Sequence, residues 1–353
     1  MASGKQGPLL AAVLSLGAAA GPAGGAEVEL EGQLQLGITH LDADDGASGQ
    51  ILGDDKGRSR IGVRVRQPLG GAGVGIAAAD VRLRPDTFGA EDDNGRPFQG
   101  REAWVGLQGG LGQLRAGRIE GAYKQAGGKY WDMLNATELE QRRAGGLAGG
   151  RHANTGFLNS VVEYRTPSMA GFEIVAQLGF DDRSDDTVDR SDGDQLLGVV
   201  YRSGPWEWIT AVSRDDGSPS GENRNWKSGL RFDSGAASVM YHFEDVRIRD
   251  VVNDGVVRDD DGPLVIDAVP LDTDTRHHMV AISQSFGQHM LWLAWGHQDA
   301  DDSGFDIHNA TLAWTRFFSA GLRWYSGVQY QDRSSGYDSG DLLVGTTGLR
   351  FDF

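Results

Sequence analysis

The 353-residue sequence predicts an all-β fold: a transmembrane, up-and-down antiparallel β-barrel of about 16 strands. Three observations predict it: strands in which apolar and polar residues alternate, connections that are short and long in turn, and recognisable patterns at both chain ends. After the N-terminal segment, no apolar run reaches the ~18 residues that a transmembrane helix needs. A hydrophobic content of 39% is compatible with a barrel, because only every second residue of a membrane strand faces lipid.

The alternation places charged side chains on one face of each expected strand. Near the N-terminus, Val28 lies on the apolar face and Glu29 on the polar one. In the next expected strand, Ile61 lies on the apolar face, and Arg60 and Arg64 lie on the polar face. Burying such charges unpaired in a packed core would cost several kcal/mol each. A wide barrel leaves them hydrated, so we expect the polar face to line a water-filled lumen. The phase is ambiguous around Trp104 and at residues 206–209.

Connection lengths alternate along the whole chain. Short turns are expected at 68–71, 109–112, 167–171, 203–205, 233–235 and 286–288. Long polar loops are expected at about 41–57, 85–99, 118–157, 181–194, 214–225, 248–275, 299–306 and 332–340. Short periplasmic turns at one end and long extracellular loops at the other are typical of an outer-membrane barrel, and a soluble sandwich has no reason to keep this rhythm.

The first 26 residues have the three parts of a secretory signal peptide. Lys5 supplies the positive charge, residues 8–20 form an apolar stretch, and residues 21–26 are a run of small residues suited to cleavage. Strand alternation begins directly afterwards, at Glu27. We therefore expect residues 1–26 to be removed and residues 27–353 to form the barrel; a short anchor or core helix is the alternative.

The C-terminus carries the second pattern. The last five residues alternate apolar and polar side chains and stop on Phe353. In a barrel the last strand closes against the first, and its final aromatic lies in the girdle at the membrane interface, so we assign barrel closure to Phe353. Many other aromatics fall near expected strand ends, as two interfacial girdles require, although ordinary core aromatics would give a similar pattern.

Several classes of function are disfavoured by composition. The chain has no cysteine, so disulfides and thiolate chemistry are excluded, and its formal net charge of −17 argues against a nucleic-acid partner. None of the eight histidines stands in a recognisable sequence motif with a Ser or Asp, so we expect no enzyme, no cofactor and no metal site. His242 falls on the polar phase and is expected to be solvated in the lumen. The acidic runs 181–186 and 259–261 do not have EF-hand spacing and are expected to be solvated loop tips, with divalent cations bridging them to lipopolysaccharide phosphates as the alternative.

Four motifs give the chain a family resemblance. They are residues 58–63 before a Pro-Leu-Gly-Gly turn, residues 100–107 followed by 112–118, residues 159–167, and the terminal Phe353. In their order and spacing they resemble the general porins of Gram-negative outer membranes. The resemblance implies a 16-stranded barrel, a homotrimer, and a third extracellular loop folded into the lumen, surrounded by outer-membrane lipid and lipopolysaccharide. It also implies passive diffusion of small hydrophilic solutes and ions; a substrate-specific channel is the alternative.

The longest connection, residues 118–157, corresponds to the loop that folds inward in that family. A filter needs charged groups that face each other across a narrow lumen. We expect the constriction to include Arg118 and the acids Glu120, Asp132, Glu138 and Glu140 on this loop. Opposite them we expect the arginines of the neighbouring wall, which are Arg58, Arg60, Arg64, Arg82, Arg84 and Arg115. The alternative is that these groups pair with one another and fix the loop. The loop carries six basic and four acidic residues, which predicts a mild preference for anions despite the acidic chain.

Overall fold

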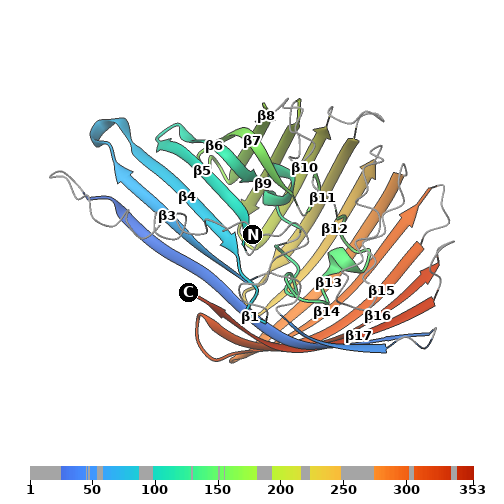
Figure 1. Ribbon diagram of the computed structural model, residues 1–353. Coiled ribbons are helices and arrows are strands. Elements are labelled where there is room, and N and C mark those ends of the chain that lie inside the picture. The colour runs from blue at the N-terminus through green and yellow to red at the C-terminus, as the bar shows by residue number, and fades with distance from the viewer. Residues whose placement is uncertain are drawn as a thin grey trace, which may run out of the picture.

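The chain forms a closed antiparallel β-barrel in the computed structural model (Figure 1). The structure describes residues 25–44, 46, 48–53, 59–86, 98–128, 130–149, 152–154, 156–180, 193–215, 223–247, 274–301, 306–334 and 340–353. The expected signal peptide up to residue 24 and both acidic runs lie outside these residues. No helix in the described part of the chain is long and apolar enough to span a membrane.

In the described part of the chain, seventeen strands make up the sheet, and each pairs with its neighbours in sequence except that β2 and β3 both pair with β1. They are β1 Glu27–Ala43, β2 Ser48–Gly53, β3 Arg60–Pro68, β4 Val74–Arg82, β5 Gln99–Gly109, β6 Gly112–Glu120, β7 Phe157–Arg165, β8 Phe172–Gly179, β9 Gln195–Ser203, β10 Trp206–Asp215, β11 Asn223–Asp233, β12 Ala237–Arg247, β13 Asp274–Phe286, β14 His289–Ala300, β15 Asp306–Phe317, β16 Leu322–Ser334 and β17 Gly340–Asp352. The up-and-down order confirms the predicted fold class.

The extra strand has a simple origin. β2 pairs with one half of β1, Gly37–Asp42, and β3 pairs with the other half, Glu27–Gln33. β2 and β3 therefore occupy one position of a 16-position barrel that is interrupted between residues 53 and 60. β2 lies within the stretch 41–57 that was expected to be a loop, so that expectation is wrong for residues 48–53. These six residues carry two large apolar side chains, Ile51 and Leu52, on adjacent positions, so they show no alternation that would indicate a strand.

The two chain ends close the barrel. In Figure 1, β17 in red lies alongside β1 in blue, and the register places Phe351 opposite Leu34. Beyond β17, the backbone of Phe353 exchanges two hydrogen bonds with Gly32, of 2.7 and 3.1 Å. The Phe353 ring lies over Gly32, where a Cβ would fall 2.3 Å from the ring, so only glycine fits beneath it. Closure thus depends on a glycine as well as on the terminal aromatic.

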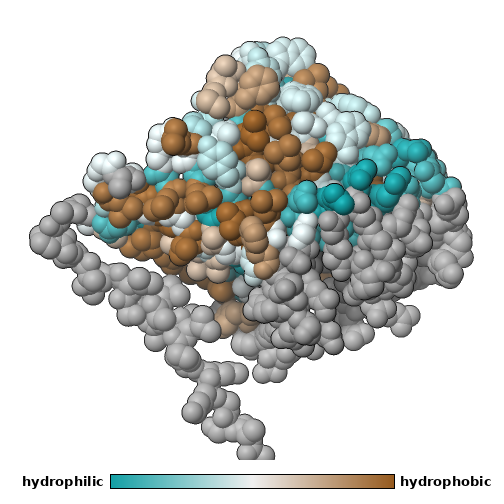
Figure 2. Space-filling view, turned by 90° about the horizontal axis from the view of Figure 1, so that it is seen from above, coloured by the Kyte–Doolittle hydropathy of each residue, from teal (hydrophilic) through white to brown (hydrophobic). Residues whose placement is uncertain are grey.

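The outer surface carries an apolar belt, as the alternation predicts. Val239 and Tyr241 on β12 are about half exposed, whereas Met240 between them is 3% exposed and faces inward. Figure 2 shows one face of the molecule on which hydrophobic residues in brown gather in a broad patch beside hydrophilic residues in teal. The two ambiguous stretches are resolved by the structure: Trp104 faces the interior, and Trp206 faces outward.

The connection between β6 and β7 runs inside the barrel; we call its residues 121–156 L3. In Figure 1 it is the green segment enclosed by the strands. Its described residues contain one short helix, α2 Ala122–Gln125, and one 3-10 turn, η3 Gln141–Arg143. Another 3-10 turn, η2 Gly70–Ala72, joins β3 to β4. The buried apolar cluster of the molecule lies largely between L3 and the wall. The expected inward fold of the third long loop is confirmed.

Candidate functional site

Two buried side chains of opposite charge, Lys227 and Glu244, bind both ends of L3 at one point of the wall. Lys227 on β11 and Glu244 on β12 lie directly opposite each other in the sheet and are fully buried. The Lys227 ammonium donates to the Gly127 carbonyl at 2.7 Å, and Glu244 accepts from the Tyr123 hydroxyl at 2.8 Å. From the far end of L3, the Asn154 amide donates to Glu244 at 2.7 Å, and its oxygen accepts from Lys227 at 3.2 Å.

His242 belongs to this contact, so the expectation that it is solvated in the lumen is wrong. Its side chain is 0% exposed. It lies beneath Gly128 of L3, where a Cβ would fall 2.4 Å from the His242 ring, and Trp131 meets its ring edge-on at 6.2 Å. Strand phase identified the correct face of the sheet, but only the path of L3 decides which part of that face is covered.

The middle of L3 is hydrogen-bonded to side chains of β1, β13, β15 and β16 on the opposite wall. Polar lumen side chains donate to its backbone carbonyls in the pairs Gln35–Ala136, His277–Gly145, Asn309–Ala144 and Gln329–Leu139. Because the acceptors are backbone groups, these bonds fix the path of the loop and not only its side chains. A loop without regular structure thereby acquires a defined position.

Two of the four predicted acids, Asp132 and Glu140, are buried in L3. Asp132 is buried, and its carboxylate accepts the backbone N–H groups of Leu134 at 2.9 Å and Gln141 at 2.7 Å. Burial raises the pKa of Asp132 to about 7, against the lowering effect of those two bonds. Glu140 is 1% exposed and pairs with Arg142 and, at 3.1 Å, with Arg143.

The other two acids also meet cations of L3. Glu120 pairs with Lys124 at 2.5 Å and Glu138 with Arg143 at 3.8 Å, with their side chains only 14% and 12% exposed. The acidic charge of the loop is thus largely compensated within the loop. These pairs fit the alternative interpretation of the sequence, in which the charged groups pair with one another and fix the loop.

On the wall, Arg64 and Arg115 flank the ring of Trp104. Their guanidinium carbons lie 5.9 and 4.7 Å from the ring centroid. Arg115 is 9% exposed and bonded through Nε to Glu163 at 2.9 Å, whereas Arg64 keeps 38% of its side chain exposed while it bonds Glu31 at 2.8 Å. Arg115 therefore belongs to the wall, and Arg64 remains accessible from the lumen.

The remaining predicted arginines differ in position. Arg118 donates to the Arg101 carbonyl at 3.0 Å and to Asn159 at 2.5 Å, which turns it toward the junction of β5, β6 and β7. Arg84 is exposed and follows the end of β4. Arg58 lies outside the described residues.

Four arginines on neighbouring strands form a line around the lumen, which we call the basic row: Arg60, Arg82, Arg323 and Arg350. Arg60 on β3 lies opposite Arg82 on β4 on one side and Gln33 on β1 on the other. Arg350 on β17 lies opposite Arg323 on β16 and within electrostatic reach of Arg60.

The basic row carries few counter-charges among its described contacts. Arg350 and Arg323 share one carboxylate, Asp352, at 2.9 and 3.4 Å. Arg60 and Arg82 donate to the neutral amides of Gln33 at 3.2 Å and Gln99 at 3.0 Å. At Arg323 and Arg350, two positive charges therefore meet one carboxylate.

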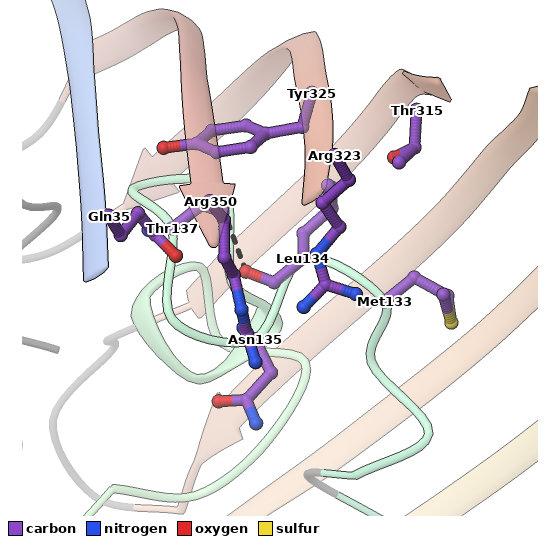
Figure 3. A pocket seen from close by; sticks show the side chains of 9 residues that line it. All are labelled: Gln35, Met133, Leu134, Asn135, Thr137, Thr315, Arg323, Tyr325 and Arg350. Atoms are coloured by element: carbon purple, nitrogen blue, oxygen red, sulfur yellow. Dashed lines mark hydrogen bonds between the residues drawn. The ribbon is translucent and has the colours of Figure 1, made fainter. Parts of the chain in front are cut away.

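L3 and the basic row meet at a recess in the lumen. Figure 3 shows the side chains of Arg323 and Arg350 reaching toward the stretch of L3 that carries Met133 and Asn135. Arg323 and Arg350 were absent from the expected constriction, although both fall on the polar phase of their strands. Their closeness to L3 follows from barrel closure, which places the C-terminal strands beside β1 and β3.

The sequence matches the family model described as Gram-negative porin over residues 10–336. The chain belongs to the Gram-negative porin family. No protein with curated function matched this porin's sequence.

Solved porins share the fold at low identity. An anion-selective porin from Comamonas acidovorans is 20% identical, with a TM-score of 0.73, over 93% of this chain and 100% of that chain. OmpF of Salmonella typhi, in complex with daunomycin, is 16% identical, with a TM-score of 0.68, over 92% and 97%. OmpT of Vibrio cholerae, in a trimer form, is 17% identical, with a TM-score of 0.63, over 93% and 99%. Family and fold support an outer-membrane channel for passive diffusion rather than an enzyme.

Proposed function

We propose that this porin is a trimeric diffusion channel whose basic row gives it a mild preference for small anionic hydrophilic solutes. The observation that carries the selectivity is the charge balance at the recess between L3 and the basic row. Glu120, Glu138 and Glu140 are paired with cations of L3, whereas Arg323 and Arg350 of the basic row share one carboxylate. An ion that passes between them meets a net positive wall.

The proposed trimer rests on the family, whose solved members include a trimer form of OmpT. Delivery by the signal peptide 1–26, with a mature chain of 27–353, is part of the same proposal, and β1 begins at Glu27. Outer-membrane lipid and lipopolysaccharide are the partners that an apolar outer belt implies.

The test is the zero-current potential across a planar bilayer under a salt gradient, measured for the parent and for the double variant Arg60→Gln/Arg82→Gln. These two arginines are chosen because each bonds a neutral amide, whereas removal of Arg115 would strand the buried Glu163. A unit charge at about 8 Å in water is worth roughly 0.5 kcal/mol before screening, about twofold in local ion concentration. We expect the anion preference to fall by a factor of about two or more, with the larger change at low salt.

The matched control is Arg316→Gln, which removes the same charge from the outer face, where Arg316 lies over Phe318. It should leave the reversal potential unchanged. A cation preference in the parent that the double variant does not alter would refute the role of the basic row and assign selectivity to the acidic loops.

A further inference from the structure

Three histidines stand side by side on the outer wall, at the long-loop end of the barrel. The register places His297 on β14 directly opposite His278 on β13 on one side and His308 on β15 on the other. Their strand neighbours Gln298 and Asn309 are buried and face the lumen, so the histidines face outward. The row arises from strand pairing, and the sequence, in which these histidines have no recognisable partner, does not show it.

Asp306 on β15 lies beside His297 and His308, so three possible metal ligands lie close together. Its Oδ1 lies 3.0 Å from Nε2 of His297 and 3.2 Å from Nε2 of His308. The two imidazole rings stack in parallel, with centroids 4.2 Å apart and an interplanar angle of 1°. One ligand atom from each of the three residues lies within 4.8 Å of the others.

These spacings fit a shared ion. Zinc binds histidine nitrogen at about 2.0–2.1 Å and carboxylate oxygen at about 2.0–2.2 Å, so adjacent ligand atoms lie roughly 2.9 Å apart around an octahedral ion and roughly 3.4 Å apart around a tetrahedral one. The two nitrogen–oxygen distances fall between these values, and the two stacked rings turn on binding so that both nitrogen lone pairs point at the ion. Two imidazoles with one carboxylate are also the ligand types that transition metals accept, whereas Mg²⁺ and Ca²⁺ prefer oxygen-only sets.

We propose that His297, Asp306 and His308 form a surface site for a divalent transition-metal ion such as Zn²⁺, which we call the rim site. The three side chains are 21%, 39% and 49% exposed, so the site opens to solvent and water completes the coordination. When bound, the ion joins β14 to β15. Without it, His297 forms a hydrogen bond with Asp306, and His308 Nε2 lies 3.2 Å from the same carboxylate oxygen.

The surroundings of the rim site favour a cation and hold its ligands in place. Asp299 lies directly opposite Asp306 in the sheet and adds a second carboxylate to the same outer face. The ring of Trp295 lies 5.9 and 6.2 Å from those of His297 and His308. Strand pairing fixes the backbone positions of the ligands, so that only the side chains rearrange on binding.

The experiment is calorimetric titration of the chelator-treated, detergent-solubilised porin with Zn²⁺ at pH 7.5, in the presence of excess Mg²⁺. We expect one Zn²⁺ per protomer, undiminished by Mg²⁺. The double variant His297→Ala/His308→Ala should weaken binding by at least about 100-fold, because loss of an outer-shell partner alone costs about 10–100-fold. His289→Ala is the matched control, since His289 is an outward residue at the other end of β14, stacked between Phe286 and Trp314.

A second measurement uses the parent protein alone. Zn²⁺ should protect His297 and His308 from diethyl pyrocarbonate while His289 keeps its reactivity. Absence of Zn²⁺ binding, binding that survives the double variant, an equal loss in His289→Ala, or displacement by Mg²⁺ would each overturn the proposal. Because the rim site lies outside the lumen, ion selectivity should be the same with and without Zn²⁺, so the channel proposal stands or falls separately.

Discussion

Replacement of Glu244 by glutamine should release L3 from the barrel wall. The side chain keeps its shape but loses the charge that faces Lys227 across the sheet and that accepts from Tyr123 and Asn154. All four groups are buried, so water does not replace the lost interactions. The substitution therefore acts on the single cluster that fixes both ends of the loop.

The magnitude follows from the contacts. Each hydrogen bond to a charged group contributes about 1.5–3 kcal/mol. The substitution weakens the bonds from Tyr123 and Asn154, and it leaves the buried Lys227 ammonium without the carboxylate opposite it in the sheet. A loss of about 3–4 kcal/mol raises the undocked population of L3 by about 100- to 1000-fold, since 1.4 kcal/mol is a factor of ten. A loop that leaves the wall obstructs the lumen intermittently.

Single-channel recording in planar bilayers is the assay. We expect Glu244→Gln to show frequent transient closures that the parent lacks, together with a lower midpoint of thermal unfolding. Glu207→Gln is the control, because Glu207 is a lumen-facing carboxylate that pairs with Arg202 at 3.0 Å and Arg231 at 3.7 Å on the wall. Noise and conductance in Glu244→Gln equal to those of the control would refute the assignment of this cluster as the anchor of L3.

Three further predictions concern assembly, the loop and the N-terminus. Deletion of Phe353 should reduce the amount of folded protein in the outer membrane, because its two backbone hydrogen bonds and its ring on Gly32 are lost; outer-membrane fractions and heat-modifiable mobility measure this. Gly128→Ala should increase channel noise as Glu244→Gln does, because the backbone there has φ of +79° and the added Cβ would meet the His242 ring. Intact mass of protein from outer membranes should match a chain that begins at Glu27.

Each of these has a contradictory outcome. Normal assembly without residue 353 would show that closure does not depend on the terminal contact with Gly32. Quiet channels in Gly128→Ala would show that the loop adjusts freely above His242. A mass that retains Met1 would exclude cleavage of the signal peptide.

Some features of the fold could be predicted from the sequence because they depend on the local alternation of apolar and polar residues. The barrel, its polar lumen and the inward third loop follow from alternation, connection lengths and family motifs, and the structure confirms them. Arg60, Arg64 and Arg82 were placed on the lumen wall for the same reason: each lies on the polar phase of a strand whose apolar phase must face lipid.

Tertiary structure alone decided which lumen residues are open and which are covered. His242 shares the polar phase with many solvated positions, yet L3 lies across it, and Arg115 is compensated by Glu163, a residue 48 positions away in sequence. Arg323 and Arg350 join Arg60 only because closure brings the last strands beside the first. The rim site likewise needs the register of β14 against β15. A strand's period of two residues fixes the face of each side chain, whereas cross-strand register and loop path fix its neighbours, and those depend on contacts between distant parts of the chain.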